Sequence, residues 1–308
     1  MSVANSALAL SVNGLNKSYG SFEVLKNLDL SIQQESILGL VGLNGSGKTT
    51  TIECILGLQA SNSGSITLFD YSPRNLHETQ GKIVGIFDTS SLHPNLTLRQ
   101  SLEHAALLTE NQVRSPEQVE ELLSIKQFTT FKIRHLSLGN KRRASLAHAL
   151  LSNPDFIVLD EPFNGLDAGG VDDVLELIQR LNKEEGTTFL LSSHQLPYLE
   201  SICSHIAILH EGAIAVSGTI ENLLQDSKHT LLLRSEPPSD ALSFLKQLEN
   251  ITVINPDANG YIQLETAVLD SSELNRQLVT NNIAVSELIL QRASLGNLFR
   301  SITSKGES

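Results

Sequence analysis

Two cysteines and a shortage of positive charge set the first limits on this 308-residue chain. Cys54 and Cys203 lie far apart in apolar stretches, so their spacing excludes a metal or redox motif and predicts two small buried core residues, as in a reducing cytoplasm. The 22 basic residues face 34 acidic ones, and a net charge of −12 argues against a nucleic-acid partner, because phosphates need a basic face. We interpret the one tight basic cluster, Lys141 to Arg143, as a solvated face at a helix start.

Long apolar runs are also missing. No stretch approaches about 18 consecutive apolar residues, so we expect no segment to span a membrane. The first residues carry no positive charge before Lys17 and no long apolar run, so we expect no secretion signal either. With 40% apolar and 18% charged residues the composition is that of an ordinary globular protein, and the length allows a large and a small domain. Any membrane role must come through a partner.

Short apolar runs alternate with helical segments over residues 8–222. The segments SILGLVG, FIVLD and TTFLLSSH have the composition of buried strands, and helical spacing follows each of the first two. Residues 97–127 show helical periodicity, with Thr97 as a plausible N-cap and Ser115 opening a second helix start. Strands that alternate with helices predict an α/β domain built on a largely parallel sheet.

The pattern changes after residue 222, where we interpret residues 223–229 as a linker. The elements predicted beyond it are strand 230–235, helix 238–249, strands 251–255 and 260–265, helix 271–282, strand 284–289 and helix 294–304. That order predicts a small ferredoxin-like or related α+β module at residues 230–305.

The segment GLNGSGKT, Gly42 to Thr49, matches the phosphate-binding loop pattern, with a predicted strand before it and a predicted helix after it. Its glycines let backbone N–H groups turn toward phosphate oxygens, and a helix N-terminus favours an anion by about 0.3–2 kcal/mol. We expect Lys48 to reach the β- and γ-phosphates and the Thr49 hydroxyl to ligate Mg²⁺. The candidate binding residues in this segment are Gly42, Asn44, Gly45, Gly47, Lys48, Thr49 and Thr50. The segment predicts binding of a nucleoside triphosphate.

The segment FIVLDEP, Phe156 to Pro162, supplies two carboxylates at the end of a predicted buried strand. Ligands of open α/β sheets lie at the carboxyl ends of the strands, so Asp160 is expected to hold Mg²⁺. Glu161 is a candidate general base for the attacking water, a role typically worth about 10²–10⁴-fold in rate. Together with the phosphate-binding loop, this pair predicts hydrolysis as well as binding.

These motifs carry a family resemblance. LSLGNKRR lies ahead of FIVLDEP, NGLD follows it, and SSH ends at His194. In that order, over residues 8–222, the chain resembles an ATP-binding cassette (ABC) ATPase. The resemblance implies a cassette fold: a parallel-sheet P-loop ATP core, an antiparallel β lobe and a helical arm near residues 97–150. It also implies ATP and Mg²⁺ as cofactors.

Several residue roles follow from the resemblance alone. Tyr19 corresponds to the aromatic residue that stacks on adenine, and His194 to the switch histidine that contacts the γ-phosphate. Asp167 belongs to the loop that crosses to the opposing subunit. The position of the family's loop glutamine is occupied by Asp88, which is a departure from the family pattern. A carboxylate can still bind Mg²⁺ or its water, but the aspartate side chain is shorter and adds a negative charge.

The segment LSLGN departs from the family signature Leu-Ser-Gly-Gly-Gln at Leu138 and Asn140. In the family, two subunits meet head to tail, and each ATP lies between one phosphate loop and the other subunit's signature. The groups implied to touch the γ-phosphate, the Ser137 hydroxyl and the Gly139 N–H, are both retained. A Leu-Ser-Leu-Gly form is similar to that of antibiotic-resistance exporters, so we interpret it as a working variant.

The resemblance implies the ATPase subunit of a transporter, acting as a homodimer or with a related cassette. We expect it at the cytoplasmic face of the membrane, bound to a separate permease. The tail SELILQRASLGNLFRSIT is similar to the C-terminal extension of the drug- and bacteriocin-export branch, which favours export. Two alternatives stay open. One is a soluble non-transport ABC ATPase, disfavoured by the single cassette and the acidic charge. The other is a nucleotide-sensing regulatory or immunity protein, disfavoured by the presence of Glu161 and His194.

Overall fold

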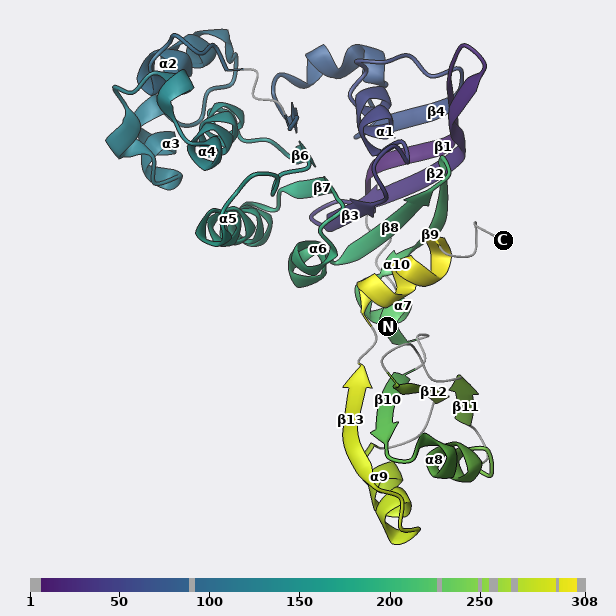
Figure 1. Ribbon diagram of the computed structural model, residues 1–308. Coiled ribbons are helices and arrows are strands. Elements are labelled where there is room, and N and C mark those ends of the chain that lie inside the picture. Colours follow the sequence, from purple (N-terminus) through teal and green to yellow (C-terminus); the bar gives the residue numbers. More distant parts are fainter. Residues whose placement is uncertain are drawn as a thin grey trace, which may run out of the picture. The chain divides into compact units, whose positions relative to one another are not determined.

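The chain divides into two compact units, Met1–Ile220 and Glu221–Ser308, each with its own hydrophobic core. A computed structural model describes residues 7–88, 92–225, 229–248, 251–254, 260–266, 271–291 and 294–303 (Figure 1). None of the helices in these ranges is long and apolar enough to cross a bilayer.

A six-stranded sheet forms the centre of the first unit, in the order β5-β6-β7-β3-β8-β9. Its strands are β3 (Ile37–Val41), β5 (Ile83–Ile86), β6 (Phe156–Asp160), β7 (Thr188–Ser193), β8 (His205–His210) and β9 (Ala213–Thr219). The first five strands in that order run parallel, and β9 returns antiparallel to β8. Every residue of β3, β6 and β7 is buried, as expected where helices such as α5 (Ala168–Glu185) and α6 (Leu196–Ile202) cover a parallel sheet. The prediction of a parallel-sheet core is confirmed.

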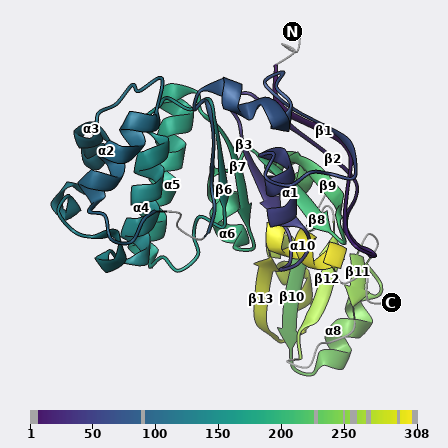
Figure 2. The ribbon, with the colours of Figure 1, turned by 90° about the horizontal axis from the view of Figure 1, so that it is seen from above.

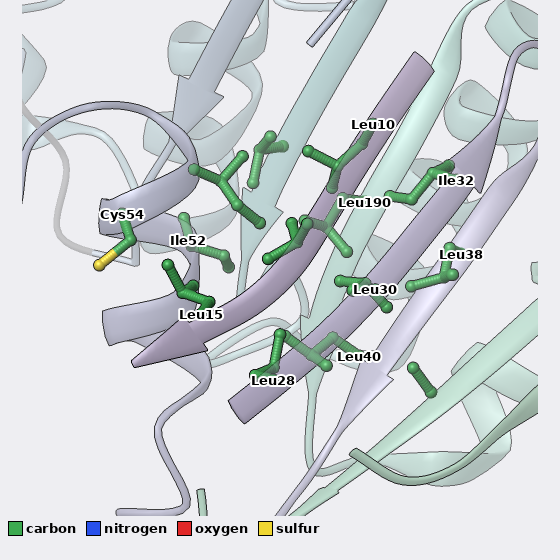
Figure 3. Close-up of a cluster of buried hydrophobic side chains, with 14 of the residues drawn as sticks. Leu10, Leu15, Leu28, Leu30, Ile32, Leu38, Leu40, Ile52, Cys54 and Leu190 are labelled. Carbon is green, nitrogen blue, oxygen red and sulfur yellow. The ribbon is translucent and has the colours of Figure 1, made fainter. Parts of the chain in front are cut away.

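An antiparallel lobe packs against this sheet. It contains β1 (Leu8–Tyr19), β2 (Phe22–Gln33) and β4 (Ser63–Leu68), in the order β2-β1-β4. Leucines and isoleucines of β1 and β2 meet β3, β7 and α1 (Lys48–Ile55) in one apolar cluster (Figure 3). Cys54 belongs to this cluster and Cys203 is also buried, and burial raises the pKa of both thiols. Both cysteines are therefore core residues, as predicted.

The expected helical arm lies beside the core (Figure 2). It contains α2 (Leu98–Leu108), α3 (Pro116–Leu122) and α4 (Leu138–Ala149), with short 3₁₀ turns at Lys126–Phe128 and Ile133–His135 between α3 and α4; a further 3₁₀ helix, Pro73–Thr79, lies between β4 and β5 outside the arm. The side chains of Thr97 and Ser115 each accept a hydrogen bond from the backbone N–H of the residue three positions later. That residue is a glutamine in both helices, and its side chain accepts a hydrogen bond from the backbone N–H of the capping residue. Both predicted helix starts are therefore confirmed, as capping boxes.

The second unit is a four-stranded antiparallel sheet in the order β11-β12-β10-β13, with a helix pair against its buried face. Its elements are β10 (His229–Ser235), α8 (Pro238–Leu245), β11 (Ile251–Ile254), β12 (Ile262–Thr266), α9 (Ser271–Thr280), β13 (Val285–Gln291) and α10 (Leu295–Thr303). This is the ferredoxin-like βαββαβ connection, followed by a last helix, as predicted. The linker prediction was wrong at residues 223–225, because α7 (Ile220–Gln225) continues the chain as a helix, and at His229, where β10 begins. Residues 226–228 lie outside the described ranges.

Candidate functional site

The phosphate-binding loop connects β3 to α1 and needs glycine at positions where the backbone is crowded. A β-carbon on Gly42 would lie 2.8 Å from the Leu209 carbonyl oxygen, a backbone atom that cannot move aside. Gly47 has a φ of +107°, which disfavours any L side chain, and a β-carbon there would lie 2.8 Å from Leu25. The loop can therefore curl tightly over the end of β3.

Lys48 is held inside this loop. Its ammonium donates to the carbonyls of Gly42 at 2.8 Å and Leu43 at 3.2 Å, and the residue is only 6% exposed. The neighbouring Ser46 hydroxyl is buried and has no hydrogen-bond partner within the described parts of the chain. Since an unpaired buried hydroxyl typically costs about 1–3 kcal/mol, this atom fits a loop that receives an oxygen-rich ligand.

Thr49 and Asp160 form a second part of the site, at the carboxyl end of β6. The Thr49 hydroxyl donates to Asp160 Oδ2 at 3.0 Å, and the other oxygen of Asp160 accepts from the buried Ser192 hydroxyl on β7. A hydroxyl and a carboxylate at this distance are hard oxygen donors of the kind that Mg²⁺ prefers. The structure brings these two predicted metal ligands together.

Glu161 directs its carboxylate into the same place. Its oxygens lie 3.0 and 3.1 Å from His194 Nδ1, and Oε1 lies 3.6 Å from Lys48 Nζ. The Glu161 side chain is 12% exposed, whereas that of His194 is 45% exposed. The structure thus gathers the predicted base, the switch histidine and the loop lysine around one point.

Asp88 is paired with an arginine beside the site. Its Oδ1 accepts from Arg142 Nη2 at 2.9 Å, and no hydrogen bond between described residues joins it to Thr49 or Asp160. The prediction of a solvated basic face was wrong for Arg142, which is 5% exposed and whose pKa is lowered by burial. The neighbouring Arg143 pairs with Asp173. Metal binding by Asp88 stays a prediction.

The signature residues line a separate cleft of about 320 Å³. Its walls are Ser137, Gly139, Asn140, Arg143, Asp167, Gly169, Gly170 and Asp173. Ser137 caps α4 and Asp167 caps α5, each accepting a backbone N–H three residues on. Leu138, the signature departure, lies over Gly165, where an added β-carbon would be 2.1 Å from Leu138 Cδ2. The leucine therefore fills space above a glycine of the NGLD loop.

The remaining predicted contacts are exposed. Tyr19 ends β1 with 46% of its surface accessible, and the Lys17 ammonium lies 4.9 Å from its ring centroid. Asn44 is exposed in the loop, and Thr50 is half-buried in the first turn of α1. Within the described residues, no hydrogen bond or ion pair connects the signature cleft to the phosphate-binding loop. The described residues therefore form two separate groups of candidate site residues, one at the phosphate-binding loop and one at the signature.

Comparison with known proteins identifies the family. Residues 25–164 match the ABC transporter family. The bacitracin transport ATP-binding protein BcrA of Bacillus licheniformis is 31% identical, over 92% of this chain and 94% of the relative. The chain belongs to the ATP-binding proteins of ABC transporters. Proteins of this family are ATPases, so the chain is an ATP-binding enzyme of that class.

Two further similarities bear on fold and direction. The methionine import ATP-binding protein MetN of Clostridium acetobutylicum is 30% identical over 86% of this chain and 85% of the relative. The solved structure of the ATP-binding subunit of an ABC transporter superposes with a TM-score of 0.63 at 29% identity, covering 70% of this chain and 91% of that one. The cassette fold is thereby confirmed, while proteins named for import and for bacitracin transport both resemble the chain.

Sequence reasoning missed three residues of this ABC ATPase. Ser46 lay inside a recognised motif, Ser192 was one of the hydroxyl residues of a predicted buried strand, and Arg142 was hidden in a basic cluster. The only signal for Ser192 was its place two residues before His194. Nothing local distinguished Arg142 from its two basic neighbours, because its burial depends on packing between α4 and the sheet.

Proposed function

We propose that this chain is the ATP-hydrolysing subunit of an exporter and drives a separate membrane permease. The observation that carries the proposal is the Glu161 carboxylate, 3.0 Å from His194 and 3.6 Å from Lys48, beside the Thr49–Asp160 pair. A proton acceptor, a phosphate-binding cation and metal-type oxygen donors at one sheet edge are the parts that phosphoryl transfer to water requires.

ATP binding is assigned to the phosphate-binding loop. The backbone N–H groups of the loop and the N-terminus of α1 hold the phosphates, and the Lys48 ammonium turns from its carbonyl partners to the β- and γ-phosphate oxygens. Tyr19, exposed at the end of β1, offers its ring to the adenine. Thr49 and Asp160 are the residues that hold Mg²⁺, which when bound neutralises charge on the β- and γ-phosphates.

In the hydrolytic step Glu161 removes a proton from the attacking water. His194, already bonded to that carboxylate, orients it and contacts the γ-phosphate once nucleotide is bound. The low exposure of Glu161 keeps bulk water from competing for its hydrogen bonds.

The signature cleft is assigned to a second nucleotide on an opposing subunit. Ser137 and Gly139 stand at the N-terminus of the 12-residue helix α4, a position that favours an anion, and Asp167 caps the adjacent α5. Among the described residues no bond connects this cleft to the phosphate-binding loop. We therefore regard the two as half-sites, which a head-to-tail dimer would complete at once.

A cavity of about 430 Å³ supports the permease assignment. It lies between the 3₁₀ turn at Pro73–Thr79, β5, α2 and α4, and Phe87, Leu92 and His148 are among its lining residues. Leu107 and Leu108 of α2 are 85% and 74% exposed, so apolar surface is available beside it. A cavity lined by both apolar and polar side chains, with exposed leucines beside it, fits an amphipathic helix of a membrane partner at the cytoplasmic face.

Two observations favour export over import. The bacitracin transport protein BcrA is similar to this chain along almost all of its length. The C-terminal tail also forms the predicted last helix, α10 (Leu295–Thr303). The division into a cassette at residues 8–222 and an accessory module at 230–305 stays a prediction, to which the two compact units lend support.

The test is Glu161→Gln, which keeps the side chain's size but removes its capacity to take a proton. We expect ATP hydrolysis to slow by about 10²-fold or more, while ATP still binds and light scattering detects a dimer with ATP and Mg²⁺. The matched control is Glu184→Gln at an exposed position of α5, which should hydrolyse ATP at the parent rate.

Hydrolysis by Glu161→Gln at the parent rate would contradict the base assignment. Co-purification from detergent-solubilised membranes tests the partner: the chain should be recovered with a polytopic membrane protein, and recovery without one would contradict the permease assignment.

A further inference from the structure

Glu161 has a strained backbone that two other elements hold in place. Its φ is +49°, in the left-handed region, which a glutamate enters at a cost of order 1–3 kcal/mol. The N–H donates to the carbonyl and hydroxyl oxygens of Ser192, each at 3.1 Å. The carbonyl oxygen accepts from Arg142 Nη2 at 3.2 Å and from the Asn164 N–H at 3.3 Å. The direction of the Glu161 carboxylate therefore depends on bonds made outside its own strand.

Arg142 supplies the side-chain bond on the carbonyl side. Its guanidinium donates to three acceptors: the Phe87 carbonyl at 2.7 Å, Asp88 Oδ1 at 2.9 Å and the Glu161 carbonyl at 3.2 Å. The fixed fork of a guanidinium can serve several acceptors at once, whereas the single ammonium of a lysine cannot reach all three in the same geometry. Arg142 thus joins the segment after β5 to the segment after β6.

Asp88 balances the charge that this arrangement buries. The Arg142 side chain is 5% exposed, and a buried cation without a counter-charge is strongly unfavourable. The Asp88 side chain is 50% exposed, so it pairs with Arg142 while its other side faces water. The departure from glutamine at position 88 therefore accompanies an arginine that needs an anionic partner.

We propose that Arg142 and Asp88 act as paired positioning residues that hold the Glu161 backbone in its strained, catalytically useful conformation. Phe87, whose carbonyl Arg142 also holds, lines the 430 Å³ cavity assigned to the permease. The inference rests on the proposed general-base role of Glu161, and it competes with the prediction that Asp88 ligates Mg²⁺.

The experiment is a double-mutant cycle on the full chain with Arg142→Met, Asp88→Ala and both together. For each variant we would measure kcat, the ATP dissociation constant and the Mg²⁺ concentration that gives half-maximal rate. We expect Arg142→Met to lower kcat by about 10- to 100-fold, as misplacement of a reacting group does, with the ATP dissociation constant within about twofold of the parent. Arg142→Lys should recover only part of the loss.

Asp88→Ala should lower kcat less than Arg142→Met, because the two carbonyl bonds of Arg142 remain. In the Arg142→Met background it should cause no further loss, since coupled residues are not additive. Under the proposal the half-saturating Mg²⁺ concentration stays unchanged in Asp88→Ala. If Asp88 were a metal ligand, Asp88→Ala would instead raise the half-saturating Mg²⁺ concentration by about tenfold or more. Its loss of kcat would then add to the loss caused by Arg142→Met.

Arg114→Met is the matched control, because Arg114 also donates to two backbone carbonyls and a carboxylate, those of Leu150, Ser152 and Glu185, outside the site. It should leave kcat at the parent value, so equal losses in both arginine variants would mean a general packing effect and overturn the proposal. If Arg142→Met folds poorly, shown by a lowered melting temperature, Arg142→Lys and Asp88→Asn complete the cycle. If every variant at position 142 has the kcat of the parent, this inference is overturned while the proposed function stands. If Glu161→Gln hydrolyses ATP at the parent rate, the proposed function itself is overturned.

Discussion

The two half-sites of this chain differ in how completely they are built. Around the phosphate-binding loop, Lys48 and Asp160 are buried; Lys48 has three hydrogen-bond or ion-pair partners and Asp160 has two. Around the signature, Ser137 and Asp167 are exposed and mainly cap their own helices. The first half-site is assembled within one chain, while the second offers only helix N-termini and an open cleft.

This difference has a physical reason. Charged groups that act on a reacting phosphate must be aligned beforehand, because reorienting them in the transition state costs energy. A surface that binds only after two subunits meet must stay open to its partner, so its groups use local capping bonds that a ligand can supplement. Under the proposed function, the chain prepares chemistry on one side and recognition on the other.

The largest effect should come from placing a charge on the recognition side alone. We expect Gly139→Asp, combined with Glu161→Gln, to abolish the ATP-dependent dimer, because a carboxylate would then face the γ-phosphate of the opposing subunit. ATP binding to the monomer should stay within about twofold of the Glu161→Gln parent, since the loop with Lys48 and Thr49 is untouched. Sedimentation with ATP and Mg²⁺ measures the first quantity and calorimetry the second. A double variant that dimerises like the single one would mean that LSLGN is not the contact across subunits.

A smaller effect should appear at the glycine beneath Leu138. Gly165 has a φ of +69°, and an added β-carbon would lie 2.1 Å from Leu138 Cδ2. Gly165→Ala should therefore lower the free energy of unfolding by about 1–2 kcal/mol in urea titrations. Gly169→Ala is the control, since its β-carbon would meet nothing within 4 Å in helix α5 and should stabilise by up to about 1 kcal/mol. Equal changes in the two variants would contradict a special role for the Leu138 contact.

A pH-dependent effect concerns α4, the helix that reaches from the signature to the 430 Å³ cavity. Burial lowers the pKa of His148 to about 4, with a further contribution from His104, and its Nε2 lies 2.9 Å from the Ser101 hydroxyl. Because the unfolded chain takes up this proton near pH 6.5 and the folded chain only near pH 4, stability from the neutral imidazole is present above pH 6.5 and is lost as the pH falls toward 4. The slope is at most about 1.4 kcal/mol per pH unit.

His148→Gln should flatten that slope between about pH 6.5 and 4 in urea titrations, relative to the parent, because glutamine does not titrate. The same slope in both proteins would contradict the burial of a neutral imidazole. ATP binding near neutral pH should not change, since His148 lies outside the phosphate-binding loop.

Local features of the fold were predictable from neighbouring residues. Thr97 and Ser115 cap helices through bonds three residues away, and the glycines of the phosphate-binding loop act within one turn. The βαββαβ order of the second unit followed from hydrophobic periodicity alone. The linker prediction failed at residues 223–225 because these residues were grouped with the polar residues that follow them, although Leu223 and Leu224 continue the helix α7.

By itself, the sequence determined that the chain binds and hydrolyses a nucleotide, because contiguous motifs shape the backbone around Lys48 and place Asp160 and Glu161 at the end of one strand. Only the tertiary structure decided which distant residues support them. Ser192 reaches Asp160 because β7 lies beside β6, and Arg142 reaches Glu161 because α4 packs over the sheet edge. Such contacts join positions 19 to 54 residues apart, and their energy depends on burial and on a shared geometry that no local pattern encodes.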